Sequence, residues 1–263
     1  MKPMKNMLFA CCFMAFSSAA FAQEIKGIST TLAAPLDILA FKKVQFSPNE
    51  QNQLCAQVKD LCQHRDQWRS LKTADQHLWL LSGADIVQFS SSTTGLKLLK
   101  QWHVNISSQK DGTSTGQFVF PKLFPMTQNR YAIAVIDTFS EMYSGGGAGI
   151  ERASFYELKS SGEIHQFINN YPFSFSRMIR ACFSEQDYER SQGHCHDEDS
   201  LSLDIRPIKP MLWQFRYRYH LSVSPASDSG EKSYQGSRNL NIDLNKAPEQ
   251  PNIPETWNYA GQE

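Results

Sequence analysis

The chain has 263 residues with 26 basic and 26 acidic side chains, and 12% of its residues are aromatic. The balanced charge gives no general attraction to nucleic acid or to an anionic membrane surface. The length and the aromatic content predict a folded core of substantial size, and we expect a single mainly-β domain over residues 23–246.

The first 22 residues have the pattern of a cleaved export signal. Lys2 and Lys5 precede the apolar run Met7–Phe16, and Ala20-Phe21-Ala22 supplies the small-x-small pattern that a signal peptidase recognises. The run is about half of the ~20 residues that a membrane-spanning helix needs, so a membrane anchor is disfavoured. A lipoprotein is disfavoured because too few apolar residues precede Cys11.

Cleavage at that point defines the mature chain. Removing Lys2 and Lys5 from the 26 basic residues leaves 24, against 26 acidic ones. We expect a periplasmic or extracellular protein, monomeric, with no transmembrane segment in the mature chain and no nucleic-acid partner.

One amphipathic helix is predicted over about residues 47–60. Ser47 is a good N-cap, Pro48 suits the first helical position, and Glu50 completes a capping box. An apolar stripe follows at helical spacing: Leu54, Cys55, Val58, Leu61 and Cys62.

The four cysteines of the mature chain predict two disulfides, because an exported chain meets an oxidising environment. Cys55 and Cys62 are seven residues apart, about 10.5 Å along an intact helix, whereas a disulfide needs Cα atoms within ~7 Å. Either the helix ends near Lys59 or Asp60 and the pairs are local, or both helix cysteines bridge to Cys182 and Cys195. We favour the local pairs.

The rest of the domain has the period-two pattern of half-buried strands. In Leu96–Ile106 the even positions are mostly apolar, and in Trp213–Val223 the odd positions are apolar or aromatic. These strands predict an antiparallel sandwich or a partly open barrel. The predicted strands are Leu36–Phe46, Leu78–Leu81, Ile86–Phe89, Leu96–Ile106, Phe118–Phe120, Tyr131–Ile136, Ser154–Leu158, Ile164–Ile168, Leu201–Ile205, Trp213–Val223 and Asn239–Leu244.

Residues 247–263 are predicted to form an extended or loosely held tail. Pro248, Pro251 and Pro254 lie there among polar residues.

A glycine-rich segment is the first candidate for binding. Tyr143 and Ser144 precede Gly145, Gly146 and Gly147, and a further glycine follows at 149. Glycine lets the backbone approach a ligand closely, and successive N–H groups can hold an anion. The segment matches neither a P-loop nor a dinucleotide fingerprint. A long hairpin connection is the simpler interpretation, and a binding loop is the alternative.

Basic residues form the second candidate. Arg177 and Arg180 precede Cys182, and Arg216 and Arg218 share one strand face. If the four side chains converge, they form a patch for a carboxylate- or phosphate-bearing partner. Isolated charges on solvent-facing strands are the simpler interpretation.

The cluster His194, His196, Asp197 and Asp199 is the third candidate, because imidazole and carboxylate groups bind divalent metals. The simpler interpretation is a polar loop closed by the Cys195 disulfide. No nucleophile elbow or metalloprotease motif is present in the sequence.

These features favour an exported, disulfide-stabilised binding or inhibitor-type protein that holds a protein or an envelope glycan, with no cofactor. It would use residues 143–149 and 172–199. One alternative is a metal-dependent envelope hydrolase that uses the His194/His196/Asp cluster. A further alternative is a structural component of the envelope.

Overall fold

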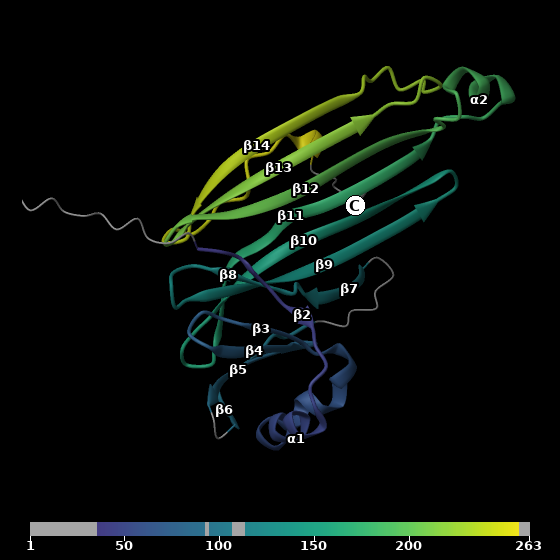
Figure 1. Cartoon of the computed structure of the whole chain (residues 1–263). Helices are drawn as coiled ribbons and strands as arrows, with labels where there is room; N and C mark the ends of the chain where they lie inside the picture. The colour runs from purple at the N-terminus through teal and green to yellow at the C-terminus, as the bar shows by residue number, and fades with distance from the viewer. Residues whose placement is uncertain (1–35, 93–94, 107–113, 258–263) are drawn as a thin grey trace, which may run out of the picture. The chain divides into compact units, whose positions relative to one another are not determined.

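The computed structural model describes residues 36–92, 95–106 and 114–257. It confirms the mainly-β prediction, with two antiparallel sheets in a sandwich-like arrangement (Figure 1). No described strand joins the two edges of the larger sheet into a closed barrel. The predicted signal sequence, residues 1–22, lies outside the described residues.

The larger sheet carries the residues that concern function. In spatial order it contains β1 (Leu39–Ala40), β8 (Lys122–Pro125), β9 (Tyr131–Tyr143), β10 (Gly146–Leu158), β11 (Ile164–Arg180), β12 (His196–Lys209), β13 (Leu212–Ser222) and β14 (Tyr234–Asp243), and β7 (Ser114–Val119) also pairs with β9.

The smaller sheet contains β2 (Lys42–Lys43), β3 (Arg69–Lys72), β4 (His77–Ser82), β5 (Asp85–Ser92) and β6 (Gly95–His103) in that order. Its strands alternate between two cores. Leu78 and Leu80 of β4 pack with the helical segment, whereas Trp79 and Leu81 pack with Ile133 and other residues of the larger sheet. The central strands β4 and β5 are therefore buried on both faces.

The helix forms where the sequence predicts its start. In α1 (Pro48–Gln57), Ser47 and Glu50 make the expected capping box. The helix ends at Gln57, and the chain continues as the 3₁₀ segment η1 (Lys59–Gln67). This earlier end brings Cys55 and Cys62 within disulfide reach, at a Cα–Cα distance of 5.6 Å. The local pairing is therefore the one in the structure.

The prediction that the even positions of Leu96–Ile106 share one face is wrong. The β5–β6 register shifts between Gln88 and Phe89, which leaves Leu99 without a direct partner. A bulge of this kind reverses the alternation that follows it. Leu98 consequently packs with the helix, and Trp102 packs with the larger sheet.

The alternation of β13 is as predicted. Trp213, Phe215, Tyr217 and Tyr219 are buried, and the residues between them are more exposed. The indole N–H of Trp213 donates to the backbone oxygen of Pro125, 2.8 Å away. Aromatic side chains therefore form much of the core against this strand.

The C-terminal segment is extended, but its described part is anchored to the larger sheet. Trp257 is 4% exposed and stacks on Tyr219, with ring centroids 5.4 Å apart. The hydroxyl of Tyr171 donates to the backbone oxygen of Glu249. These contacts hold residues 247–257 in place, in contrast to the loose attachment that their composition suggests.

Candidate functional site

The glycine-rich segment forms the tip of the β9–β10 hairpin, and two of its glycines serve the fold. Ser144 and Gly145 are the two turn residues between the register pair Tyr143 and Gly146. Gly145 has φ +96°, which side chains with a Cβ rarely adopt. At Gly146 a Cβ would lie 2.1 Å from the backbone oxygen of Met178 on β11.

Gly149 has no such structural requirement. Its φ is not positive, and a Cβ there would meet nothing closer than the hydroxyl of Ser176 at 3.7 Å. Gly147 is intermediate, since its Cβ would lie 3.1 Å from the backbone oxygen of Glu141. A glycine inside a strand weakens the strand by roughly 0.5–1 kcal/mol relative to alanine. It often marks a place where another backbone or a ligand approaches.

The two strand glycines form the floor of a groove. Their register partners place Gly147 opposite Met142 and Met178, and Gly149 opposite Ser140 and Ser176. All of these residues lie on one face of the sheet, which we call the open face. The strands on either side of β10 are about 9–10 Å apart. The resulting pocket has a volume of about 560 Å³ and extends to Glu198, Ser200 and His220.

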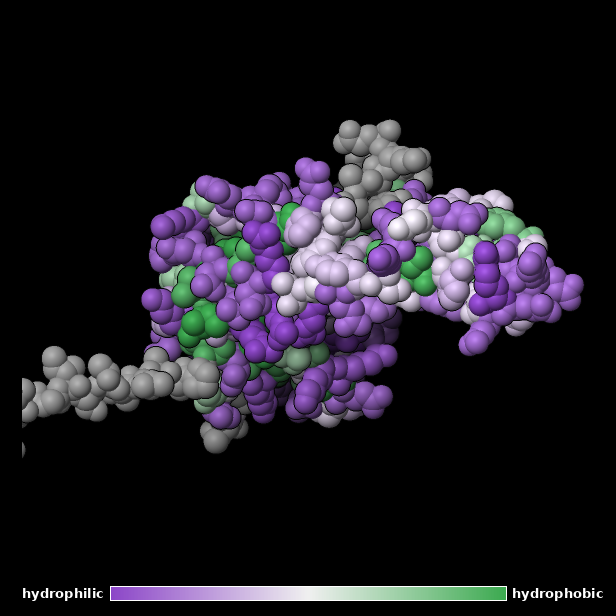
Figure 2. All heavy atoms as spheres, turned by 90° about the horizontal axis from the view of Figure 1, so that it is seen from above, coloured by the Kyte–Doolittle hydropathy of each residue, from purple (hydrophilic) through white to green (hydrophobic). Residues whose placement is uncertain are grey.

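Exposed hydrophobic side chains gather at the same end of the sheet, beside the groove. Met142 is 91% exposed and Phe183 is 76% exposed. Seen from above, hydrophobic residues lie among hydrophilic ones at the right, toward the end that carries α2 (Glu185–Ser191) (Figures 1 and 2). We call the set the end patch; it consists of Met142, Tyr143, Met178, Ile179, Phe183 and Tyr188. Met142 and Met178 lie on the open face, whereas Tyr143 and Ile179, the register partners of Gly146, lie on the opposite face.

A disulfide closes the loop that carries part of the end patch. Cys182 and Cys195 pair locally, at a Cα–Cα distance of 5.0 Å and a sequence separation of 13. Between them, Ser184 and Asp187 form a capping box that starts α2. The backbone N–H of Ala181 donates to the oxygen of Cys195, so the loop leaves and re-enters the sheet at adjacent points.

Removal of this disulfide is expected to loosen the loop. The loop-entropy model gives a loss of about 3 kcal/mol in the free energy of unfolding for the double variant C182A/C195A. Denaturant unfolding of the variant and of the oxidised wild type measures this loss. Amide exchange in α2 is expected to rise in the variant. A loss below ~1 kcal/mol with unchanged exchange would show that the loop is held by its other contacts.

The side chain of Arg177 lies on the opposite face of the sheet from Gly147 and Gly149 and pairs with a buried aspartate. Its guanidinium makes two hydrogen bonds of 2.8 Å to the carboxylate of Asp199, whose side chain is 3% exposed. The hydroxyl of Tyr219 also donates to Asp199, at 3.2 Å. Burial, followed by the charge of Asp199, raises the pKa of Tyr219 to about 12, so this hydroxyl stays protonated at neutral pH.

The other predicted arginines do not join Arg177 in one patch. Arg180 donates to the backbone oxygen of Cys182 and lies over the ring of Phe183. Arg218 is 3.5 Å from Asp204 on the open face. Arg216 is the register partner of the same aspartate. The structure thus brings the glycine segment and residues 176–200 together but separates Arg177 from Arg216 and Arg218.

The predicted metal cluster lies at the start of β12, where several of its groups have hydrogen-bond partners. Asp197 accepts from the backbone N–H of Ser224 and the hydroxyl of Ser227. Asp199 is bound by Arg177, and the backbone oxygen of His194 accepts from Ser224. His196 is the register partner of Arg180. Within residues 36–92, 95–106 and 114–257, no three His, Cys, Asp or Glu side chains are grouped to hold a metal ion.

Sequence inspection did not single out Met142, Met178 or Ser176, which line the groove. Their position depends on the pairing of β9, β10 and β11, and no local pattern reveals that register. One feature of the sequence could have indicated the groove. Gly149 lies outside the hairpin turn formed by Ser144 and Gly145, so the turn does not explain why a glycine is present at this position.

Among the described residues, no helix has the length and apolar character needed to cross a membrane. The chain matches no family model, no curated protein and no solved structure with which it was compared, so its function is inferred from its own geometry.

Proposed function

We propose that the protein is an exported, disulfide-stabilised binding protein of the inhibitor type, which holds a partner protein at the groove and the end patch. The groove floor at Gly149 carries the proposal, because this glycine weakens β10 and serves no turn or close contact of the fold. Its lack of a side chain leaves the sheet surface between Ser140 and Ser176 open, next to the opening that Gly147 leaves between Met142 and Met178.

The chemistry of the surface favours a protein over a glycan. Methionine side chains are flexible and polarizable, and they adapt to apolar groups of a partner. Exposed aromatic and methionine side chains are characteristic of the centres of protein interfaces. Phe183 and Tyr188 add apolar area, and Arg180 and Glu198 lie nearby for polar contacts at the rim.

Export is supported by the predicted signal and by the two disulfides. Both disulfides connect cysteines of the mature chain, and structural disulfides persist in oxidising compartments. Intact-mass measurement of the protein isolated from cells is expected to give a chain that begins at Gln23. A mature chain that retains residues 1–22 would contradict the export part of the proposal.

The binding part of the proposal is tested by replacing Gly149 with leucine, whose side chain would fill the groove. Wild type, G149L and the control S202L are used to isolate partners from an envelope extract, and the affinity of each purified partner is then measured. Ser202 on β12 is exposed on the open face of the sheet and does not line the groove. We expect a protein partner whose affinity falls at least tenfold with G149L and stays within twofold with S202L.

Two results would overturn the proposal. One is a partner with equal affinity for wild type and G149L, provided that G149L unfolds at the wild-type temperature. The other is recovery of a glycan in place of a protein, which would assign the groove to the competing class of ligand.

A further inference from the structure

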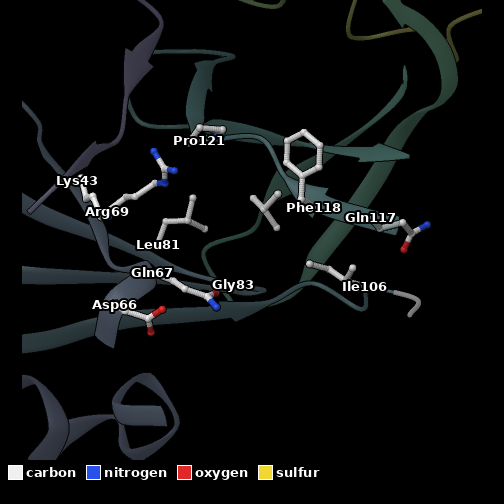
Figure 3. Close-up of a pocket in the computed structure, with 11 residues that line it drawn as sticks. Lys43, Asp66, Gln67, Arg69, Leu81, Gly83, Ile106, Gln117, Phe118 and Pro121 are labelled. Carbon is white, nitrogen blue, oxygen red and sulfur yellow. The ribbon is translucent and has the colours of Figure 1, made fainter. Parts of the chain in front are cut away.

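A second pocket opens beside the smaller sheet, away from the groove. It has a volume of about 570 Å³. Its apolar wall comes from both sheets and from the segment after β6: Leu81, Ile106, Phe118, Val119 and Pro121. Its polar side carries Lys43, Asp66, Gln67 and Arg69 (Figure 3).

Two cations face each other at this pocket. Lys43 on β2 and Arg69 on β3 are direct register partners in the antiparallel pair. Like charges in this position destabilise a sheet. Neither side chain forms an ion pair with any residue that the structure describes. The pair therefore costs stability in the protein alone, and an anion placed between the two cations would remove that cost.

The apolar wall continues from the cations across the pocket. Leu81 and Val119 line the pocket and are buried, and Phe118, which also lines it, is 39% exposed. The Asp66 carboxylate lies apart from the Arg69 guanidinium (Figure 3). Gln117 also lines the pocket, beside Phe118 (Figure 3). One end of the pocket is therefore cationic and the other is mainly apolar, over a volume typical of small-molecule sites.

We propose that this pocket binds a single-chain anionic amphiphile, with its carboxylate or phosphate head between Lys43 and Arg69. Its hydrocarbon chain lies along Leu81, Val119 and Phe118. Arg69 binds the head group through a planar pair of donors, and Lys43 contributes a compact charge. This site is independent of the groove at Gly149.

Calorimetry on the mature full-length protein tests the site with four probes: laurate, dodecyl phosphate, dodecanol and inorganic phosphate. We expect laurate or dodecyl phosphate to bind at least tenfold more tightly than dodecanol, with affinity that falls as salt is added. Inorganic phosphate is expected to bind too weakly to detect. Equal binding of dodecanol, or phosphate binding as tight as that of the amphiphiles, would overturn the proposal.

Substitutions of Lys43 and Arg69 test whether the amphiphile binds at this pocket. The double variant K43Q/R69Q is expected to lose at least tenfold in affinity for laurate and to unfold at or above the wild-type temperature, because a like-charge pair is removed. K43R/R69K keeps both charges and is expected to bind within a few-fold of wild type. The control K97Q/K232Q changes two exposed lysines that do not line the pocket. Undiminished binding by K43Q/R69Q would overturn the assignment.

Discussion

Replacing Arg177 with leucine is expected to lower the free energy of unfolding by about 3 kcal/mol. The variant leaves the carboxylate of Asp199, 3% exposed, without its cation. Breaking a buried ion pair from one side usually costs ~3–5 kcal/mol because an uncompensated charge stays buried. The lower end applies here, since the Arg177 side chain is 32% exposed and Tyr219 still donates to Asp199.

A matched control separates this effect from loss of a surface charge. Arg218 lies on the open face and is 3.5 Å from Asp204, with both side chains more than a third exposed. An exposed pair contributes ~0–1 kcal/mol, so R218L is expected to be nearly neutral. The double variant R177L/D199L is expected to recover much of the stability lost in R177L, because no charge is then buried. A loss below ~1 kcal/mol in R177L would show that Asp199 does not depend on Arg177.

The second large effect distinguishes glycines that serve the fold from those that form the groove. G146A would place a Cβ 2.1 Å from the backbone oxygen of Met178 and 2.6 Å from the Tyr143 ring. The β10–β11 pairing must then shift, and we expect a loss of about 3 kcal/mol. G149A meets nothing closer than 3.7 Å and is expected to gain roughly 0.5–1 kcal/mol, because alanine restricts the unfolded chain more than glycine does.

Chemical denaturation of G146A and G149A gives both values under the same conditions. Equal destabilisation by the two variants would mean that Gly149 also serves the fold. The argument for a groove shaped by function would then fail, although the end patch would remain exposed. Stabilisation by G149A would show that the natural sequence retains a glycine that its own fold does not require.

The sequence predicts those helices and strands that depend on residues close together in the chain. The capping box at Ser47 and Glu50 places the start of α1, and the alternation of Trp213–Val223 identifies β13 and its buried face. The same kind of capping box, formed by Ser184 and Asp187, starts α2. That helix has only seven residues and no apolar stripe, so periodicity did not reveal it.

Features set by pairing between strands were not predictable in this way. The bulge at Leu99 depends on the β5–β6 register, and it sends Leu98 and Trp102 to different cores. The long strands β9 and β11 end in polar or exposed residues, so the apolar pattern reveals only their buried parts. The groove forms only when β9, β10 and β11 pair in register, and no local pattern in the sequence specifies that pairing.

The candidate site was partly predictable for the same reason. Residues 143–149 and the arginines near Cys182 stood out by composition, and the structure brings the two segments together through β10–β11 pairing. Their roles follow from geometry. Arg177 is turned toward Asp199, while Met142 and Met178 flank the glycine floor, and no single stretch of sequence indicates either arrangement.

Site-specific photocrosslinking in cells tests the groove most directly. A benzophenone amino acid replaces Ser176, which lines the groove, or Asn241, which is exposed on β14 and paired with Gln214 away from the groove. We predict a single crosslinked protein adduct from position 176, lost when Gly149 is changed to leucine in the same chain, and none from position 241. Crosslinking of the same species from both positions, or an adduct at position 176 that persists in the G149L chain, would contradict the groove as the binding site.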